Sequence, residues 1–223
     1  MKILHINSID SDPHRRYVAW LGKAMEREVT EQQRLVVDDV EAYCEQQGVD
    51  LLVFSTANER HDIQHRLDQC RTLRLPYMFL LPSMRKLQPL RRLLLPVTML
   101  EEEIYKAQLA GTLVRRTGCR VCLLSAHDYG SKAQQNADKI ATALAQTQAD
   151  VVRLEAMKDS FHLYKEVTDR QKDFLSDMIF WTASRDYGLD DLLFGPPERR
   201  IIMQSQVPVM LVSPRADLFS LCD

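Results

Sequence analysis

The stretch that decides the fold runs from Asp177 to Val212 and reads DMIFWTASRDYGLDDLLFGPPERRIIMQSQVPVMLV. It opens with an apolar strand, Met178 to Thr182, and closes with a second one, Val209 to Val212. Between them lie a polar loop and a Gly-Pro-Pro turn at Gly195 that leads into a helix. A strand followed by a loop and a helix start is where α/β folds bind phosphates, because the free N–H groups of the helix point at the anion. The stretch predicts an α/β fold with a phosphate loop that is poor in glycine.

Apolar strands and helical segments alternate over the second half of the chain. Helices are predicted over residues 98–117, 131–148, 160–175 and 198–206. The predicted strands are short and almost continuously apolar, which is typical of parallel strands buried on both faces; they are Arg92 to Val97, Val121 to Ser125, Val151 to Leu154, Met178 to Thr182 and Val209 to Val212. This alternation predicts a doubly wound, mainly parallel sheet with helices on both faces.

Local signals place the ends of several helices. Thr98 followed by Glu101 predicts a capping box, and the run Glu101 to Glu103 suits the first turn, where the helix dipole favours negative charge. Ser131 with Gln134 predicts a similar cap. Gly118 is expected just past the end of the helix that Thr98 opens.

The first half of the chain has fewer predicted elements. Strands are expected at Lys2 to Ile6, Leu51 to Phe54 and Tyr77 to Leu81. The region from His14 to Gln47 is predicted to hold two helices, the second closed by Gly48 as its C′ residue. A further helix is expected over residues 59–73, and residues 82–89 are interpreted as a linker.

An internal repeat relates the two halves. The segment LPYMFLLP at residues 75–82 parallels VPVMLVSP at residues 207–214, with both prolines and the methionine in the same register. The upstream strands at Leu51 and Met178 also correspond, and each follows an aspartate. Two matched strands in the same order indicate a tandem duplication. We therefore predict two domains, residues 1–90 and 91–223, of which the first lacks counterparts of the second and third strands.

Composition excludes several classes of protein. The chain has 223 residues, 45% of them hydrophobic, and a formal net charge of −2. Its apolar runs are only strand-sized, so no membrane span is expected, and a near-neutral charge without a basic stripe argues against nucleic acid. Five scattered cysteines favour free thiols in a reducing compartment, so we expect a cytoplasmic protein. Cys119 and Cys122 lie at strand spacing on opposite faces and are not expected to share a metal.

The second half resembles a universal stress protein domain, and the whole chain resembles the tandem form of that family. The resemblance covers residues 91–214 well and is partial over residues 1–82. It rests on Leu93 to Val97, the strand at Met178 with its loop, Gly188-Leu189 leading to Gly195, and the closing strand at Val209. It implies a Rossmann-like fold of the adenine nucleotide α-hydrolase type. It also implies that closing strands pair edge to edge, here Tyr77 to Leu81 with Val209 to Val212.

The nucleotide motif of the family is largely replaced. On the family pattern, its first two glycines fall on Thr182 and Arg185, the third is kept as Gly195, and the hydroxyl residue after it is Pro196. The family's acidic residue at the end of the first strand falls on Thr98. Proline has no backbone N–H, so Pro196 and the following proline remove two donors from the phosphate-binding turn.

Two functions remain open at this stage. The first is a non-enzymatic stress-response or regulatory protein that needs no cofactor and acts through protein partners, with a homodimer through edge strands as one option. The second is an ATP- or AMP-binding protein, whose degenerate site comprises six residues: Thr98, Thr182, Ser184, Arg185, Gly188 and Gly195. Arg185 is expected either to contact a phosphate or to pair locally with Asp186.

An enzyme is not expected, because no nucleophile–base set and no metal motif is evident. His127 and Asp128 follow a strand, but no serine elbow accompanies them. His61 and His65 have the i, i+4 spacing that can hold zinc, but no third ligand lies nearby in the sequence. No catalytic residue and no metal ligand is therefore predicted.

Overall fold

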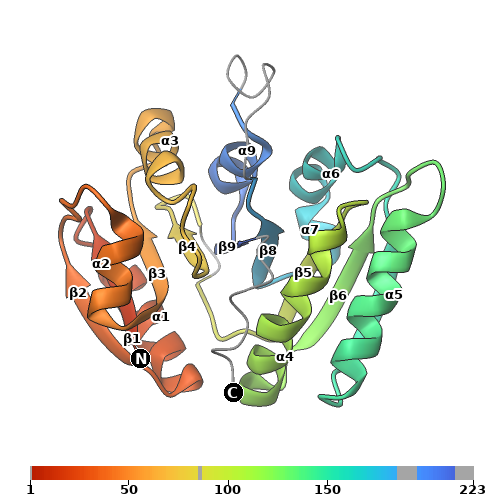
Figure 1. The fold of residues 1–223 in the computed structure, drawn as a ribbon, viewed down its shortest axis with the longest axis horizontal. Coiled ribbons are helices and arrows are strands. Elements are labelled where there is room, and N and C mark those ends of the chain that lie inside the picture. The colour runs from red at the N-terminus through yellow and green to blue at the C-terminus, as the bar shows by residue number, and fades with distance from the viewer. Residues whose placement is uncertain (1, 85–86, 185–194, 214–223) are drawn as a thin grey trace. The chain divides into compact units, whose positions relative to one another are not determined.

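The computed structural model describes residues 2–84, 87–184 and 195–213 and divides into two units. The first unit takes residues 1–89 and 183–213, and the described part of the second is residues 90–182. Each unit is a sheet of mainly parallel strands flanked by helices, as Figure 1 shows. The predicted α/β, Rossmann-like fold is confirmed.

The first unit holds five described strands in the order β2-β1-β3-β4-β9. The first four are parallel, and β9 runs antiparallel to β4. Its elements are β1 (Lys2–Asn7), α1 (Asp12–Met25), β2 (Glu28–Gln32), α2 (Val40–Gln47), β3 (Val49–Ser55), α3 (Arg60–Gln69), β4 (Tyr77–Leu80), α9 (Pro197–Gln204) and β9 (Val209–Val212).

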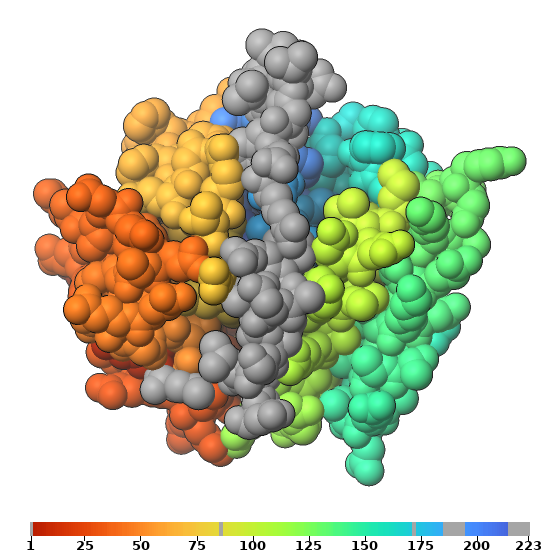
Figure 2. Space-filling model, in the orientation of Figure 1, coloured from red at the N-terminus to blue at the C-terminus, as the bar shows by residue number. Residues whose placement is uncertain are grey.

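The second unit holds four described strands, all parallel, in the order β8-β5-β6-β7. Its elements are β5 (Arg92–Val97), the 3-10 helix η1 (Glu101–Tyr105), α4 (Lys106–Thr117), β6 (Arg120–Ser125), α5 (Lys132–Ala145), β7 (Val151–Glu155), α6 (Leu163–Asp169), α7 (Gln171–Phe174) and β8 (Met178–Thr182). Helices α4 and α5 lie side by side on one face of this sheet (Figures 1 and 2).

Strand composition explains the place of each strand in its sheet. The inner strands β3 and β5 are built mainly from large apolar residues and are buried along almost their whole length. The outer strands β2 and β7 carry charged residues and are mostly exposed. Parallel strands covered on both faces need continuous apolar sequence, whereas a strand at the margin of a sheet does not.

Strand β2 was not predicted, because residues 14–47 were expected to hold only two helices. Its sequence, EVTEQ, has one apolar residue and no strand signal of its own. It is held by parallel pairing with β1, from Lys2 opposite Glu28 to Ile6 opposite Gln32. A strand therefore lies beside β1 where no second strand was predicted for this half of the chain, and the tandem form itself stays a prediction.

The C-terminal ends of two helices were predicted correctly, whereas two N-terminal capping boxes were not. Gly48 and Gly118 are the expected C-terminal residues in the left-handed region, with φ of 62° and 66°. The capping boxes at Thr98 and Ser131 are not formed, because neither side chain caps its helix. The first of these helices begins as η1, and the hydroxyl of Thr98 bonds Glu103 instead of capping. The helix expected over residues 160–175 is divided into α6 and α7.

The expected pairing of the two closing strands is confirmed. Tyr77 lies opposite Leu211, Met78 opposite Met210 and Phe79 opposite Val209. This pairing places residues 183–213 in the first unit, whereas the repeat in the sequence groups them with the second domain. Among the described residues, no helix is long and apolar enough to cross a membrane.

Candidate functional site

Each unit has one point where the order of its strands reverses. In the first unit β1 lies between β2 and β3. In the second unit β5 lies between β6 and β8. Open α/β sheets bind ligands outside the carboxyl ends of the strands at such a reversal. A ligand site is therefore expected at the ends of β1 and β3 in the first unit and of β5 and β8 in the second.

Two predicted site residues of the second unit meet at its reversal point. Thr98 follows β5, and its hydroxyl donates to Glu103 Oε1 at 2.6 Å. Thr182 ends β8, and its hydroxyl donates to Glu103 Oε2 at 2.9 Å. All three side chains are buried. The sequence predicted Glu103 in the first turn of a helix, as a charge that favours the helix dipole, so its role as the centre of this cluster was missed.

Lys106 completes the cluster as the partner of Glu103. Its Nζ lies 2.5 Å from Glu103 Oε2, donates to the Pro96 carbonyl at 2.6 Å, and stands 5.9 Å from the centre of the Trp181 ring. The residue is only 1% exposed. Burial lowers the pKa of Lys106, and the Glu103 carboxylate acts in the opposite direction. The ends of β5 and β8 are thus occupied by an ion pair of the chain itself.

The loops around this cluster are tied by further hydrogen bonds. Asn136 of α5 donates to the carbonyls of Thr98 and Leu100, at 3.1 and 2.8 Å. Ser160, after β7, accepts from Met99 N at 2.8 Å. The hydroxyl of Ser160 in turn donates to Asp128 at 2.5 Å. The segment that follows β5 is therefore fixed by side chains from α5 and from the segment after β7. These bonds favour a rigid cluster that does not open to admit a ligand.

The turn that would hold a phosphate belongs to the first unit. Ser184 N donates to Glu198 Oε1 at 2.5 Å, and Glu198 is a buried residue in the first turn of α9. A carboxylate of the chain therefore accepts an N–H in the turn where the family motif would bind an anion. Pro196 and Pro197 open α9 as expected, without side-chain capping.

Gly195 is required by the geometry of this turn. Its φ is +82°, and a Cβ placed on it would overlap the guanidinium of Arg199. Arg199 Nη1 also donates to Gln64 Oε1 of α3 at 2.9 Å. The glycine thus allows a guanidinium to pass close to the backbone, which is a structural reason for its presence. Arg185 and Gly188, the remaining predicted site residues, lie outside the described residues.

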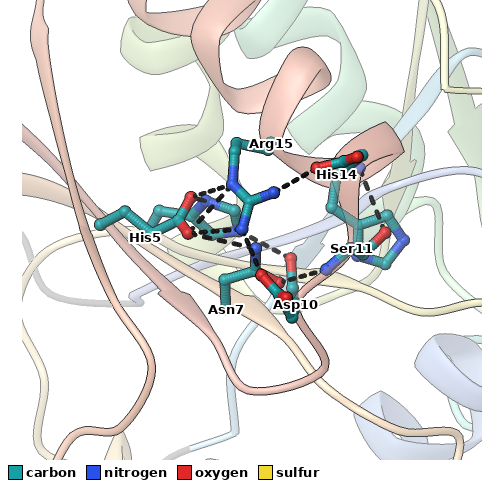
Figure 3. A network of polar contacts seen from close by, with 9 residues as sticks. His5, Asn7, Asp10, Ser11, His14 and Arg15 are labelled. Carbon is teal, nitrogen blue, oxygen red and sulfur yellow. Dashed lines mark hydrogen bonds and ion pairs between the residues drawn. The ribbon is translucent and has the colours of Figure 1, made fainter.

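A second polar cluster, shown in Figure 3, lies at the reversal point of the first unit. His5 of β1 is 1% exposed, and its Nε2 lies 2.7 Å from Ser55 Oγ at the end of β3. Its Nδ1 lies 3.4 Å from Glu31 Oε2 of β2. Three neighbouring strands are therefore linked through one imidazole. Burial is the main reason that the pKa of His5 is lowered.

Arg15 of α1 lies on the solvent-exposed side of this cluster. Its guanidinium bonds both oxygens of Glu31 at 3.0 to 3.1 Å and also contacts Asp10 and Asp12 (Figure 3). The hydrogen bonds from Arg15 are the main reason that the pKa of Glu31 is lowered. His14 lies buried beside the cluster, and burial lowers its pKa from 6.5 to about 4. The cluster thus holds two buried imidazoles with lowered pKa next to a carboxylate that is paired with a guanidinium.

The order Ser55–His5–Glu31 matches that of a nucleophile, a base and an acid, but its burial does not suit catalysis. Ser55 is 0% exposed, and Glu31 is already engaged by Arg15. A nucleophile must reach its substrate, so this set holds the strands together in the described structure. These residues were not predicted from the sequence. The available signal was a histidine within the apolar strand Lys2–Asn7 and a serine at the end of another.

The other sequence candidates do not form sites among the described residues. No group of three or more His, Cys, Asp or Glu side chains there could hold a metal ion, so His61 and His65 do not belong to a metal site of the described residues. Cys119 is buried and Cys122 half-buried, and both are free thiols. Burial raises the pKa of Cys122 to about 11, so its thiol is protonated and unreactive at neutral pH.

Solved structures of the same fold are found, although no family model and no curated protein matches the sequence. A universal stress protein from Archaeoglobus fulgidus DSM 4304 matches with a TM-score of 0.66 and 12% identity, over 97% of this chain and 88% of that one. A putative universal stress protein from Pseudomonas aeruginosa UCBPP-PA14 matches with a TM-score of 0.55 and 11% identity, over 99% and 86%. A functionally unknown protein from Pseudomonas aeruginosa PAO1 matches with a TM-score of 0.55 and 11% identity, over 99% and 84%. The chain therefore has the universal stress protein fold.

Proposed function

We propose that this protein is a non-enzymatic universal stress protein-like factor that acts in the cytoplasm through protein contacts. The observation that carries the proposal is the buried Glu103–Lys106 pair at the ends of β5 and β8. In this fold a ligand is expected at that place, and here the side chains of the chain itself occupy it.

The energetic cost of reopening the second unit supports this proposal. A nucleoside there would have to separate Glu103 from Lys106 and release Thr98 and Thr182. Breaking a buried ion pair costs about 3–5 kcal/mol. Since about 1.4 kcal/mol is a factor of ten in affinity, the cost would weaken nucleotide binding by roughly two to four orders of magnitude.

The first unit supports the same proposal by a different chemistry. The Glu198 carboxylate accepts the N–H of Ser184, and a phosphate in that turn would meet a negative charge instead of a free donor. Pro196 and Pro197 offer no N–H of their own. At the strand reversal, His5, Ser55 and Glu31 bond one another. In both units the polar groups at the expected ligand sites thus bond other groups of the chain instead of a ligand.

The alternative is an ATP- or AMP-binding protein with a modified phosphate loop. Ser184 and Gly195 lie in the turn that such a pocket would use, and Arg185 would be its cation. A thermal unfolding titration with ATP, AMP and cAMP separates the two functions. A ligand present at 100 times its Kd stabilises the folded state by about 2.7 kcal/mol. That raises the Tm of a chain of this size by roughly 5–10 °C.

We expect no shift with any of the three nucleotides and no nucleotide in mass spectra of the purified protein. The informative variant is Arg185→Ala, with Arg71→Ala as its control because Arg71 is an exposed arginine of the first unit. Stabilisation by ATP that disappears in Arg185→Ala but persists in Arg71→Ala would establish the alternative function.

The non-enzymatic part of the proposal has a separate test. A fluorophosphonate probe reacts with activated serines, so it reports whether Ser55 is an accessible nucleophile. We expect no labelling of the folded protein, because Ser55 is completely buried. Labelling that is lost in both Ser55→Ala and His5→Asn would instead show a hydrolytic site.

A further inference from the structure

Strand β7 is the outer strand of the second unit. It pairs in parallel with β6, and no other strand pairs with it among the described residues. All of its residues except Val151 are exposed. An outer strand presents unpaired backbone groups that another strand can bond.

The hydrogen bonds to β6 show which residues of β7 direct their backbone outward. Val121 N donates to the Asp150 carbonyl at 2.9 Å, and Ala156 N donates to the Ser125 carbonyl at 2.8 Å. The Leu154 carbonyl also faces β6, because it accepts from Ser125 Oγ at 3.3 Å. Backbone direction alternates along a strand, so the N–H and C=O groups of Val151, Arg153 and Glu155 point to the open side.

The sequence of β7, VVRLE, carries two charged residues of opposite sign, Arg153 and Glu155, and lacks several other features that protect an outer strand. It contains no proline, no glycine and no lysine, and its pairing with β6 is regular. The outer strand of the first unit is different. Strand β2, EVTEQ, carries two glutamates and no basic residue, so two copies of it would bring only like charges together.

Apolar side chains lie next to this open side. Val152 and Leu154 are 36% and 39% exposed. Residues two apart share one face of a sheet, so both side chains project from the same face of β7. Val152 lies opposite the half-buried Cys122 of β6. A partner that extends the sheet would cover part of this apolar face as well as the open backbone groups.

We infer that β7 pairs antiparallel with β7 of a second copy of this chain, with Leu154 opposite Leu154 of the partner subunit at the two-fold axis. In this register Arg153 of one chain lies opposite Glu155 of the other, twice per dimer. Arg153 and Glu155 both direct their backbone groups outward, so each such pair also exchanges two hydrogen bonds. Cross-strand pairs of opposite charge stabilise a sheet, and like pairs destabilise it.

Neighbouring registers lack this complementarity. A shift of two residues in one direction places Arg153 opposite its own copy, and a shift in the other direction places Glu155 opposite its own copy. Arg153 already bonds Asp138 of α5, and Glu155 bonds His127, so both side chains are held near the face on which they would meet.

This inference deepens the proposed function, since it names a protein partner, and its test needs no nucleotide, so the two can fail separately. Sedimentation equilibrium of the full chain over a range of concentrations measures the dimer constant. We expect a reversible dimer, weakened about tenfold or more by Arg153→Glu or by Glu155→Arg. The double variant R153E/E155R restores opposite charges across the axis and should return the constant to near its original value.

The control for charge alone is Arg71→Glu in the first unit, which changes the net charge by the same amount as Arg153→Glu and should leave the dimer constant unchanged. A backbone variant, Arg153→Pro, removes an outward N–H that bonds nothing in β6. It should keep the thermal unfolding of the monomer close to the original and abolish the dimer.

A cross-link tests the register directly. Opposed residues of a non-hydrogen-bonded antiparallel pair have Cα atoms about 4.5 Å apart, which is within the range of a disulfide. Leu154→Cys should therefore form a covalent dimer on mild oxidation, whereas Val152→Cys, which faces a different residue, should not. A chain that stays monomeric, a dimer indifferent to both charge reversals, or efficient cross-linking through Val152→Cys instead would overturn the inference.

Discussion

Replacing Lys106 by methionine tests whether the ion pair in the second unit is as tightly integrated as its contacts indicate. The change removes the ammonium and keeps an apolar side chain of similar length. Glu103 would still accept from Thr98 N, Thr98 Oγ1 and Thr182 Oγ1. Because three donors remain on the carboxylate, we expect the cost at the low end of the range for breaking a buried pair, about 3 kcal/mol.

Replacing Glu103 by glutamine should cost more. Lys106 would then be surrounded by neutral groups, namely the Pro96 carbonyl, the ring of Trp181 and the glutamine amide, which leaves a buried ammonium without a counter-ion. We expect about 5 kcal/mol for this variant. In the double variant both charges are gone, so its cost should be smaller than the sum of the single costs by about 2 kcal/mol or more.

Equilibrium unfolding in urea measures these free energies, with the slope checked so that a change in cooperativity is not taken for a change in stability. The Tm of Lys106→Met should fall by roughly 6–12 °C. The control is Lys165→Met on α6. Lys165 stands at the same 5.9 Å from an aromatic ring, that of Tyr164, but is exposed, so its loss should cost less than about 0.5 kcal/mol.

Two outcomes would refute the reasoning. One is a Lys106→Met protein within about 1 kcal/mol of the original, which would mean that the ammonium is not buried against Glu103 in solution. The other is a double variant whose cost equals the sum of the single costs, since residues in direct contact should show a coupling energy.

Three further predictions concern acid stability, the phosphate turn and the thiols. The pKa of His14 is about 4 when folded and 6.5 when unfolded, so the unfolded state binds more protons between these values; stability should fall by about 3 kcal/mol as pH drops from 6.5 to 4, and urea unfolding of His14→Gln should show a shallower pH dependence. Gly195→Ala should cost more than Gly48→Ala in the same assay, because both have positive φ but only a Cβ at Gly195 meets a guanidinium; equal costs would contradict the close approach. Cys44 and Cys70 are buried thiols with raised pKa, so mass spectrometry should find neither alkylated by iodoacetamide until the protein is denatured.

Features that depend on local pattern were well predicted from the sequence. The buried strands were found because a run such as Met178 to Thr182 is almost entirely apolar, and burial on both faces requires that. Gly48 and Gly118, which end helices α2 and α4, were predicted because a residue with left-handed backbone conformation at the end of a helix is usually glycine. In contrast, β2 was missed because it is stabilised by its pairing with β1 and not by its own composition.

The candidate sites were less predictable, because they join residues that are distant in sequence. Thr98 and Thr182 were named through a family resemblance, but nothing local indicates that one carboxylate binds both. Glu103 in a run of three glutamates suits an exposed helix turn, and only the fold shows that the third one is buried. The cluster of His5, Ser55 and Glu31 likewise exists because parallel pairing brings three strand positions together.

The sequence by itself determined the class of the fold and the lack of backbone N–H donors at Pro196 and Pro197. Alternating apolar strands and helices imply a parallel sheet, and two prolines lack backbone N–H groups in any conformation. The tertiary structure alone decided which side chains occupy the ends of the strands and which strand is left open. Those outcomes depend on strand order and register, and these are set by packing between segments that no local pattern relates.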